Sequence, residues 1–178
     1  MESIKNTVEG GRLAIRWKTF SLEQINSTED PDFRIWENPK YPSKGVLALV
    51  ASKAAKNQGD EPFLKFHRAT FETMHDKTMD ISDMSLLKEV ARDVGLDLAR
   101  FENEITQEKT WQAVGKDHTE SREKYGVFGV PTLVFGEGKP VFVKLQSIPE
   151  SQKERLALFE LVYRMGAKMP YLLELKRP

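Results

Sequence analysis

The chain has 178 residues, 39% of them hydrophobic and three of them tryptophan, which favours one domain with a genuine core, or one domain with a large insertion. Lys plus Arg and Asp plus Glu both number 27, so the net charge is zero and the basic excess typical of a nucleic-acid-binding surface is missing. Neither an apolar run of about 18 residues, as a membrane span needs, nor an apolar signal-peptide core occurs. We therefore expect a cytoplasmic protein that binds neither nucleic acid nor membrane.

The first predicted element is a strand. Apolar residues alternate with polar or small ones over residues 13–17, directly after the Gly10-Gly11 turn, and this period of two is typical of a strand. Residues 21–42 show no clear period and contain three prolines. They predict an irregular connection that Phe33 and Trp36 anchor.

The middle of the chain is predicted to be helical. Apolar residues at helical spacing follow cap residues, and the predicted helices begin after Ser43, at Asp60, near Ser82 or Asp83, and after the cap Asp97. The helix from Asp60 carries the clearest apolar stripe, formed by Phe63, Phe66, His67, Thr70, Phe71 and Met74. A longer helix, with Trp111, Val114, His118 and Tyr125 on one side, is predicted to end at Gly126.

After Gly126 the period changes from helix to strand. Strands are predicted over 132–135 and 141–145 with a glycine-rich turn between them, and a final helix runs from Pro149 to about Gly166. A strand cannot bury its apolar face alone, so we expect 13–17 and the hairpin to share one sheet. The helices between residues 43 and 107 then form an insertion that covers this sheet.

Few residues of this chain suggest catalysis or metal binding. His67 and His75 are eight positions apart, about 12 Å along a helix, which is too far for one shared metal ion. His67 lies in an apolar stripe and is read as a core residue. His118 also faces the apolar side, but it precedes the Gly-Val-Pro segment, so a structural role and a role in a site both stay open. No zinc-protease, phosphate-loop or hydrolase motif occurs, and we expect no metal site.

The chain contains no cysteine at all. This excludes disulfides, thiolate metal ligands and a cysteine nucleophile from these residues. No catalytic residue is therefore assigned.

The segment Gly129-Val130-Pro131-Thr132 allows two interpretations. Proline lacks a backbone N–H, so the first residue of a strand is one of the few strand positions it can take. An X-Pro bond is cis in only about 5% of cases in folded proteins. On local chemistry alone, the segment is a stiff entry into a strand.

The order of these elements, together with several short stretches, resembles a known family. The stretches are IRWKTFSLEQIN (15–26), GLDLARFE (95–102) and DHTESREKYGVFGVPTLVF (117–135). The chain is similar to the DsbA-like thioredoxin-domain family, in the branch of the FrnE-type dithiol–disulfide oxidoreductases and 2-hydroxychromene-2-carboxylate isomerase. The resemblance implies an α/β, thioredoxin-like fold with a mixed sheet and a large all-helical insertion. The thioredoxin-like domain then comprises 1–42 and 108–178, and the insertion comprises 43–107.

The resemblance also implies a site. In that family the proline matching Pro131 is cis, and its loop, here Gly129 to Thr132, lies against the active-site thiols. The residue matching Val130 pairs with the backbone of the substrate. Gly129, Val130, Pro131, Thr132 and His118 are therefore the candidate substrate-binding residues.

The chain departs from the family at its start. Family members begin with a strand and then a Cys-x-x-Cys, or a Ser in place of the first Cys, at the start of a long helix, whose dipole stabilises a thiolate. Residues 1–6 resemble the last turns of that helix. We therefore expect an N-terminally truncated form whose first strand and catalytic cysteines are missing.

Three functions follow from the resemblance. The first is a thiol–disulfide oxidoreductase that acts on a peptide, thiol or small-molecule substrate without a bound cofactor, inactive in thiol exchange as the chain stands. The second is a glutathione-dependent isomerase or transferase, with a low-molecular-weight thiol such as glutathione as cofactor. The third is a non-catalytic binding module, with a homodimer formed through the open sheet edge.

Overall fold

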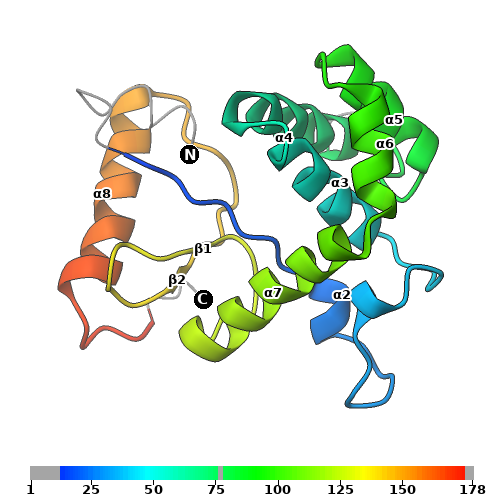
Figure 1. The fold of residues 1–178 in the computed structure, drawn as a ribbon. Coiled ribbons are helices and arrows are strands. Elements are labelled where there is room, and N and C mark those ends of the chain that lie inside the picture. Colours follow the sequence, from blue (N-terminus) through cyan, green and yellow to red (C-terminus); the bar gives the residue numbers. More distant parts are fainter. Residues whose placement is uncertain (1–12, 76–77, 175–178) are drawn as a thin grey trace. The chain divides into compact units, whose positions relative to one another are not determined.

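A computed structural model of the protein describes residues 13–75 and 78–174 (Figure 1). The described chain forms two compact units. One, the helical unit, is Thr19–Glu120, and the other, the hairpin unit, comprises residues 13–18 and 121–174 of the described chain. Helix α7 contributes residues to both units.

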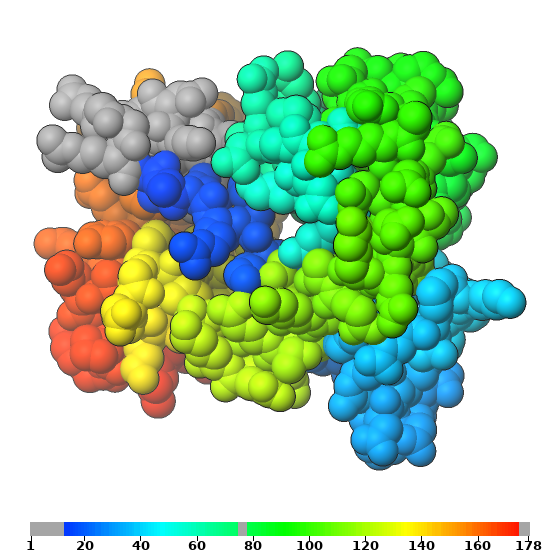
Figure 2. Space-filling view, viewed as in Figure 1, coloured from blue at the N-terminus to red at the C-terminus, as the bar shows by residue number. Residues whose placement is uncertain are grey.

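The helical unit consists of helices and their connections. Its elements are α2 (Leu22–Ile25), η2 (Ile35–Glu37), α3 (Val46–Lys56), α4 (Asp60–His75), α5 (Met84–Asp93), α6 (Leu98–Thr106) and the first part of α7 (Glu108–Tyr125). The predicted caps at Asp83 and Asp97 accept hydrogen bonds from the backbone N–H groups of Ser85 and Arg100. The connection before α3, predicted to be irregular, contains the short helices α2 and η2, which the sequence did not predict. The loops before and after η2 extend outward from the helical unit, as Figures 1 and 2 show, whereas Ile35 and Trp36 of η2 are buried.

The core of the helical unit is formed where α3, α4, α5 and α6 pack on one another. Val50, Phe66, Leu87 and Phe101 are fully buried there, and the rings of Phe66 and Phe101 lie 5.4 Å apart. Full burial of one such side chain contributes about 1.5–3 kcal/mol to folding. The predicted helices therefore supply the apolar faces that hold this unit together.

The predicted stripe on α4 is only partly correct. Phe63, Phe66 and Thr70 are buried, whereas Phe71 and Met74 are exposed. An apolar stripe is buried only along the part of the helix that a neighbouring element covers. The apolar period in the sequence does not show where that coverage ends. The ring of Phe71 instead lies 4.7 Å from the ring of His67 on the same helix.

The hairpin unit contains the two strands and the last helix. β1 (Thr132–Leu133) pairs antiparallel with β2 (Val141–Phe142), with Thr132 opposite Phe142 and Leu133 opposite Val141. α8 (Gln152–Lys168) packs on β2. Its first turn is held by a capping box, in which Ser151 and Glu154 bond each other's backbone N–H groups. The predicted hairpin is confirmed, with strands shorter than expected.

The predicted strand over 13–17 is wrong. Exposure alternates along these residues as the sequence pattern requires, yet none of them is in a strand. The described part of the chain has one two-stranded sheet, formed by β1 and β2 alone. Alternation determines which side chains point inward, but a strand also needs a hydrogen-bonded partner. The expected shared sheet is therefore reduced to the hairpin.

Two further predictions about the chain stay open. The Gly10-Gly11 turn and the helix end at residues 1–6 lie outside the described residues. The division into 1–42 with 108–178 and the insertion 43–107 stays a prediction, since compactness places 19–42 and 108–120 with the helical unit. No helix in the described residues is long and apolar enough to cross a membrane.

Candidate functional site

The candidate loop begins where α7 ends. Gly126 has a φ of +62°, a left-handed conformation that glycine adopts without steric cost. Its N–H donates to the carbonyl of Arg122 at 3.0 Å, and the N–H of Val127 donates to the carbonyl of Ser121 at 3.0 Å. These bonds satisfy carbonyls at the helix end and turn the chain toward β1.

Two hydrogen bonds fix the loop from Gly129 to Thr132. The Oγ1 hydroxyl of Thr132 donates to the carbonyl of Gly129 at 2.7 Å, which closes the loop on itself. The N–H of Val143 donates to the carbonyl of Pro131 at 3.0 Å, which joins the loop to the end of β2. The peptide bond between Val130 and Pro131 is cis. The hairpin therefore holds the loop on both sides of Val130.

The turn between β1 and β2 is attached to α8. The N–H of Lys139 donates to the carbonyl of Gly166 at 2.9 Å. At this contact a Cβ on Gly138 would lie 2.5 Å from the carbonyl oxygen of Gly166, closer than real Cβ contacts come. Only glycine at 138 allows the two backbones to approach in this way. The last helix thus supports the strand pair that carries the loop.

Val130 and Pro131 are the exposed residues of the loop, and Val130 is the one with free backbone groups. Its exposed fraction is 45%, and in the described part of the chain its backbone N–H and C=O make no hydrogen bond. The neighbouring carbonyl of Pro131 is already taken by Val143. Val130 therefore offers one donor and one acceptor in an exposed position, which an extended peptide backbone can pair with.

An exposed aromatic pair, which the sequence did not predict, lies next to the loop in the chain and in the hairpin. The rings of Phe128 and Phe142 lie 5.1 Å apart, and Phe128 is 64% exposed. A Cβ on Gly129 would lie 3.0 Å from Cε2 of Phe142, so this ring also covers the loop backbone. The opposed positions of Thr132 and Phe142 in a hairpin could have indicated this contact, because cross-strand residues are neighbours.

His118 belongs to the helical unit, whereas Gly129, Val130, Pro131 and Thr132 belong to the hairpin unit. His118 is only 4% exposed, and its Nδ1 accepts a hydrogen bond from the backbone N–H of Ser21 at 3.2 Å. Its ring stacks on Phe20 at 4.7 Å and lies 5.1 Å from Trp36. These contacts describe a packed histidine that holds the start of α2 on α7. Its role in substrate binding stays a prediction.

The residue before His118 makes a second attachment in the same region. The carboxylate of Asp117 accepts hydrogen bonds from the backbone N–H of Thr19 at 2.9 Å and from its hydroxyl at 3.3 Å. Lys53 of α3 forms an ion pair with the same oxygen. Asp117 and His118 together fasten residues 19–21 to α7, at a sequence separation of nearly one hundred residues. Such a separation gives no local signal in the sequence.

The site has no thiol nucleophile. The chain contains no cysteine. Among the described residues, no group of three His, Cys, Asp or Glu side chains is placed to hold a metal ion. What the arrangement offers chemically is a rigid loop with an exposed pairing position and an aromatic wall.

Comparisons with known proteins agree with this architecture. The model of the DSBA-like thioredoxin domain family matches residues 3–154. The chain therefore belongs to the DSBA-like thioredoxin domain family. This membership, the helices and the small sheet are compatible with a thioredoxin-like, mixed α/β fold.

Two relatives show the extent of the similarity. The uncharacterized protein YwbO of Bacillus subtilis is 24% identical over an alignment 182 positions long, gaps included, which covers 86% of this chain and 90% of that protein. The uncharacterized protein Rv2286c of Mycobacterium tuberculosis is 26% identical over 169 aligned residues, which cover 93% of this chain and 70% of that protein.

Proposed function

We propose that the protein belongs to the thiol–disulfide oxidoreductases of its family and that Gly129–Thr132 is its substrate-binding loop. The observation that carries the proposal is the exposed, unpaired backbone of Val130 in a loop that Thr132 and Val143 fix on either side. Family membership supports it. The substrate is an extended, cysteine-containing peptide or a small thiol compound.

The residues of this chain would bind and orient the substrate. The N–H and C=O of Val130 pair with the substrate backbone, as an added strand does. The rings of Phe128 and Phe142 contact an apolar side chain next to the reacting sulfur. Thiol exchange itself needs a thiolate that attacks a disulfide sulfur and releases the other sulfur as a thiolate. Residues 1–178 do not supply that thiolate, since they include no cysteine.

Amide hydrogen exchange tests the loop directly. A saturating extended peptide with one cysteine is expected to slow exchange at the Val130 N–H at least about tenfold, because pairing removes this donor from water. The amide of Glu137, in the hairpin turn, serves as the internal control and should not change. Glutathione in a parallel titration probes a small thiol as the ligand. Unchanged exchange at Val130 with both probes would contradict the loop's assignment.

A second function rests on a separate observation, the absence of cysteine. The loop could serve a binding module that recognises a peptide without thiol chemistry. The oxidoreductase and the binding module can be distinguished on the protein isolated from its own cells. Three measurements are needed: the rate of insulin reduction by dithiothreitol, the intact mass of the protein and a titration of its thiols. Faster reduction of insulin in the presence of the protein, together with a titratable thiol, supports the oxidoreductase. Peptide binding without either supports the binding module.

A further inference from the structure

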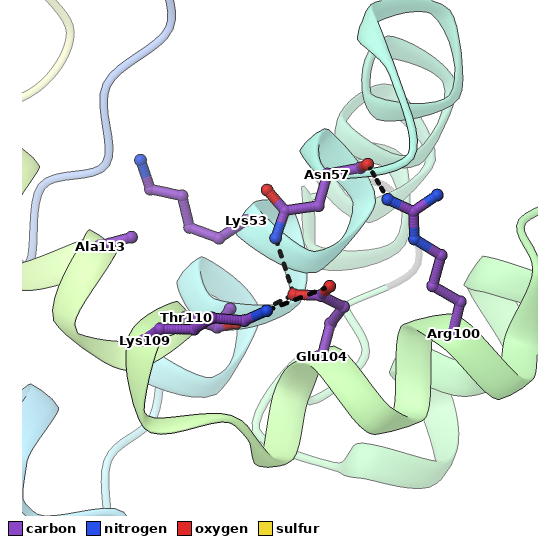
Figure 3. A pocket seen from close by; sticks show the side chains of 7 residues that line it. All are labelled: Lys53, Asn57, Arg100, Glu104, Lys109, Thr110 and Ala113. Atoms are coloured by element: carbon purple, nitrogen blue, oxygen red, sulfur yellow. Dashed lines mark hydrogen bonds and ion pairs between the residues drawn. The ribbon is translucent and has the colours of Figure 1, made fainter.

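Three helices of the helical unit line a pocket of about 440 Å³ (Figure 3). The lining residues are Lys53 of α3 and Asn57 at its C-cap, Arg100 and Glu104 of α6, and Lys109, Thr110 and Ala113 of α7. Residues four apart lie on the same face of a helix, so each helix presents one such pair to the pocket. Three of the lining side chains are cationic and one is a carboxylate.

The carboxylate belongs to the wall of the pocket. Glu104 has a side chain that is only 12% exposed. It accepts hydrogen bonds from Nδ2 of Asn57 at 2.8 Å and from the hydroxyl of Thr110 at 3.3 Å. The amino group of Lys109 lies 3.8 Å from its other oxygen. Both oxygens of Glu104 are thus engaged by the protein.

Arg100 carries a positive charge without a matching carboxylate. Its Nη2 donates to the backbone carbonyl of Asn57, the residue that ends α3. Within the described residues, no carboxylate forms an ion pair with Arg100. A guanidinium has five N–H donors, and this bond uses one of them. The remaining donors can bind an anion.

The two lysines extend the positive charge across the pocket. Lys109 is 70% exposed and only loosely paired with Glu104, whereas Lys53 is paired with Asp117, outside the lining. Even with Asp117 counted, three cations face two carboxylates. Figure 3 shows the amino group of Lys53 and the guanidinium of Arg100 on opposite sides of the pocket residues, with Asn57 and Glu104 between them.

We propose that this pocket binds a small oxyanion, a phosphate or a carboxylate, with Arg100 as its main donor and Lys109 as the second. The planar guanidinium matches two oxygens of either group, and such charge-assisted hydrogen bonds are about twice as strong as neutral ones. The surplus positive charge favours an anion over a neutral ligand. The ligand is bound by helices α3, α6 and α7, so this function is additional to the proposed thiol chemistry.

Titration of the ¹⁵N-labelled protein with inorganic phosphate, and separately with succinate, tests the pocket at constant ionic strength. Saturable shifts are expected at the amides of Asn57, Thr110 and Ala113. Arg100→Gln should weaken binding about tenfold, the loss expected for a charge-assisted pair. Lys65→Gln, an exposed cation on α4 paired with Glu61, is the matched control and should bind as the unmodified protein does.

Two more variants separate binding from folding. Arg100 also holds the end of α3, so Lys109→Gln provides a second loss of charge that touches no backbone, with an expected weakening of several fold. Glu104→Gln keeps the size of the side chain and removes a like charge, so anion affinity should rise several fold. Saturation by phosphate alone assigns a phosphate ligand, and saturation by succinate assigns a carboxylate. Absence of saturation with both probes, or an Arg100→Gln titration identical to that of the unmodified protein, would overturn the proposal.

Discussion

Gly115 of α7 faces the indole of Trp36 so closely that a Cβ at this position would lie 2.2 Å from Nε1. Trp36 is itself buried and packs against His118 one turn further along the helix. The absence of a side chain at 115 is therefore what lets the connection between α2 and α3 dock on α7.

Gly115→Ala is expected to destabilise the protein despite the better helix propensity of alanine. The gain in propensity is about 1 kcal/mol, whereas forcing a methyl group into packed atoms costs about 1–3 kcal/mol and here displaces a whole indole. Urea unfolding measures the net loss. The double variant with Trp36→Leu should lose less stability than the sum of the single variants, because the clash is gone. Additive losses would mean that the two residues do not interact.

Thr132→Val tests the hydrogen bond that closes the loop. Valine keeps the shape of threonine but leaves the carbonyl of Gly129 without the hydroxyl, with an expected loss of about 1 kcal/mol of unfolding free energy. Peptide affinity should fall as the loop loosens. Thr132→Ser keeps the hydroxyl and should retain affinity. Equal affinities of the two variants would show that this bond does not organise the loop.

Glu23 gives the fold a defined acid sensitivity. Burial by itself raises the pKa of this carboxyl, but hydrogen bonds from the Ser43 hydroxyl and the backbone N–H groups of 44–46 at the start of α3 together lower it. The folded pKa lies below the ordinary value of 4.5. The carboxylate therefore stabilises the fold above that value, and this contribution is lost as the pH falls through the folded pKa.

Glu23→Gln should lower stability at pH 7 by about 1 kcal/mol, because a neutral oxygen replaces the charged acceptor of these hydrogen bonds. It should also flatten the fall in stability between about pH 5 and pH 3. Thermal unfolding across this range measures both effects. Glu123→Gln, an exposed position on α7, is the control and should keep the acid sensitivity. A Glu23→Gln curve parallel to that of the unmodified protein would be inconsistent with a stabilising Glu23 carboxylate.

His118→Phe separates the two roles considered for this histidine. Phenylalanine keeps the ring between Phe20 and Trp36 but removes the acceptor for the N–H of Ser21, which is buried. A loss of about 1–3 kcal/mol is expected, the cost of a buried donor without a partner. His118→Asn keeps an acceptor and loses the ring. Peptide titrations below the unfolding temperature then show whether His118 also contributes to binding.

The helices were predictable because their signals are local. Asp83 and Asp97 are caps a few residues from the apolar positions that they precede, and both cap as expected. The loop at 129–132 was selected from the sequence because it lies between a predicted helix and a predicted hairpin, in the order that the family resemblance requires. Residues 13–17 show the limit of such reasoning, since a strand depends on a partner that alternation does not specify.

The contacts of the sites were less predictable for the same reason. Ser21 and His118, or Arg100 and Asn57, meet only after several helices have packed. In the sequence, nothing distinguishes the cations of the pocket from the other charged residues of their helices. These cations come together only when α3, α6 and α7 pack on one another, and the spacing of the residues in the sequence does not predict that packing.

The contact of Gly138 with Gly166 bears on which changes of length the chain can accept. The turn between the strands is held against the backbone of α8, so an added residue at 136–139 would separate β2 from the helix that supports it. Among the described residues, 144–148, between β2 and α8, make no hydrogen bond to α8 or to the loop. A peptide tag or a fused domain inserted there would leave the loop at 129–132 in place, which makes this segment the natural point for attaching the protein to a surface or a reporter.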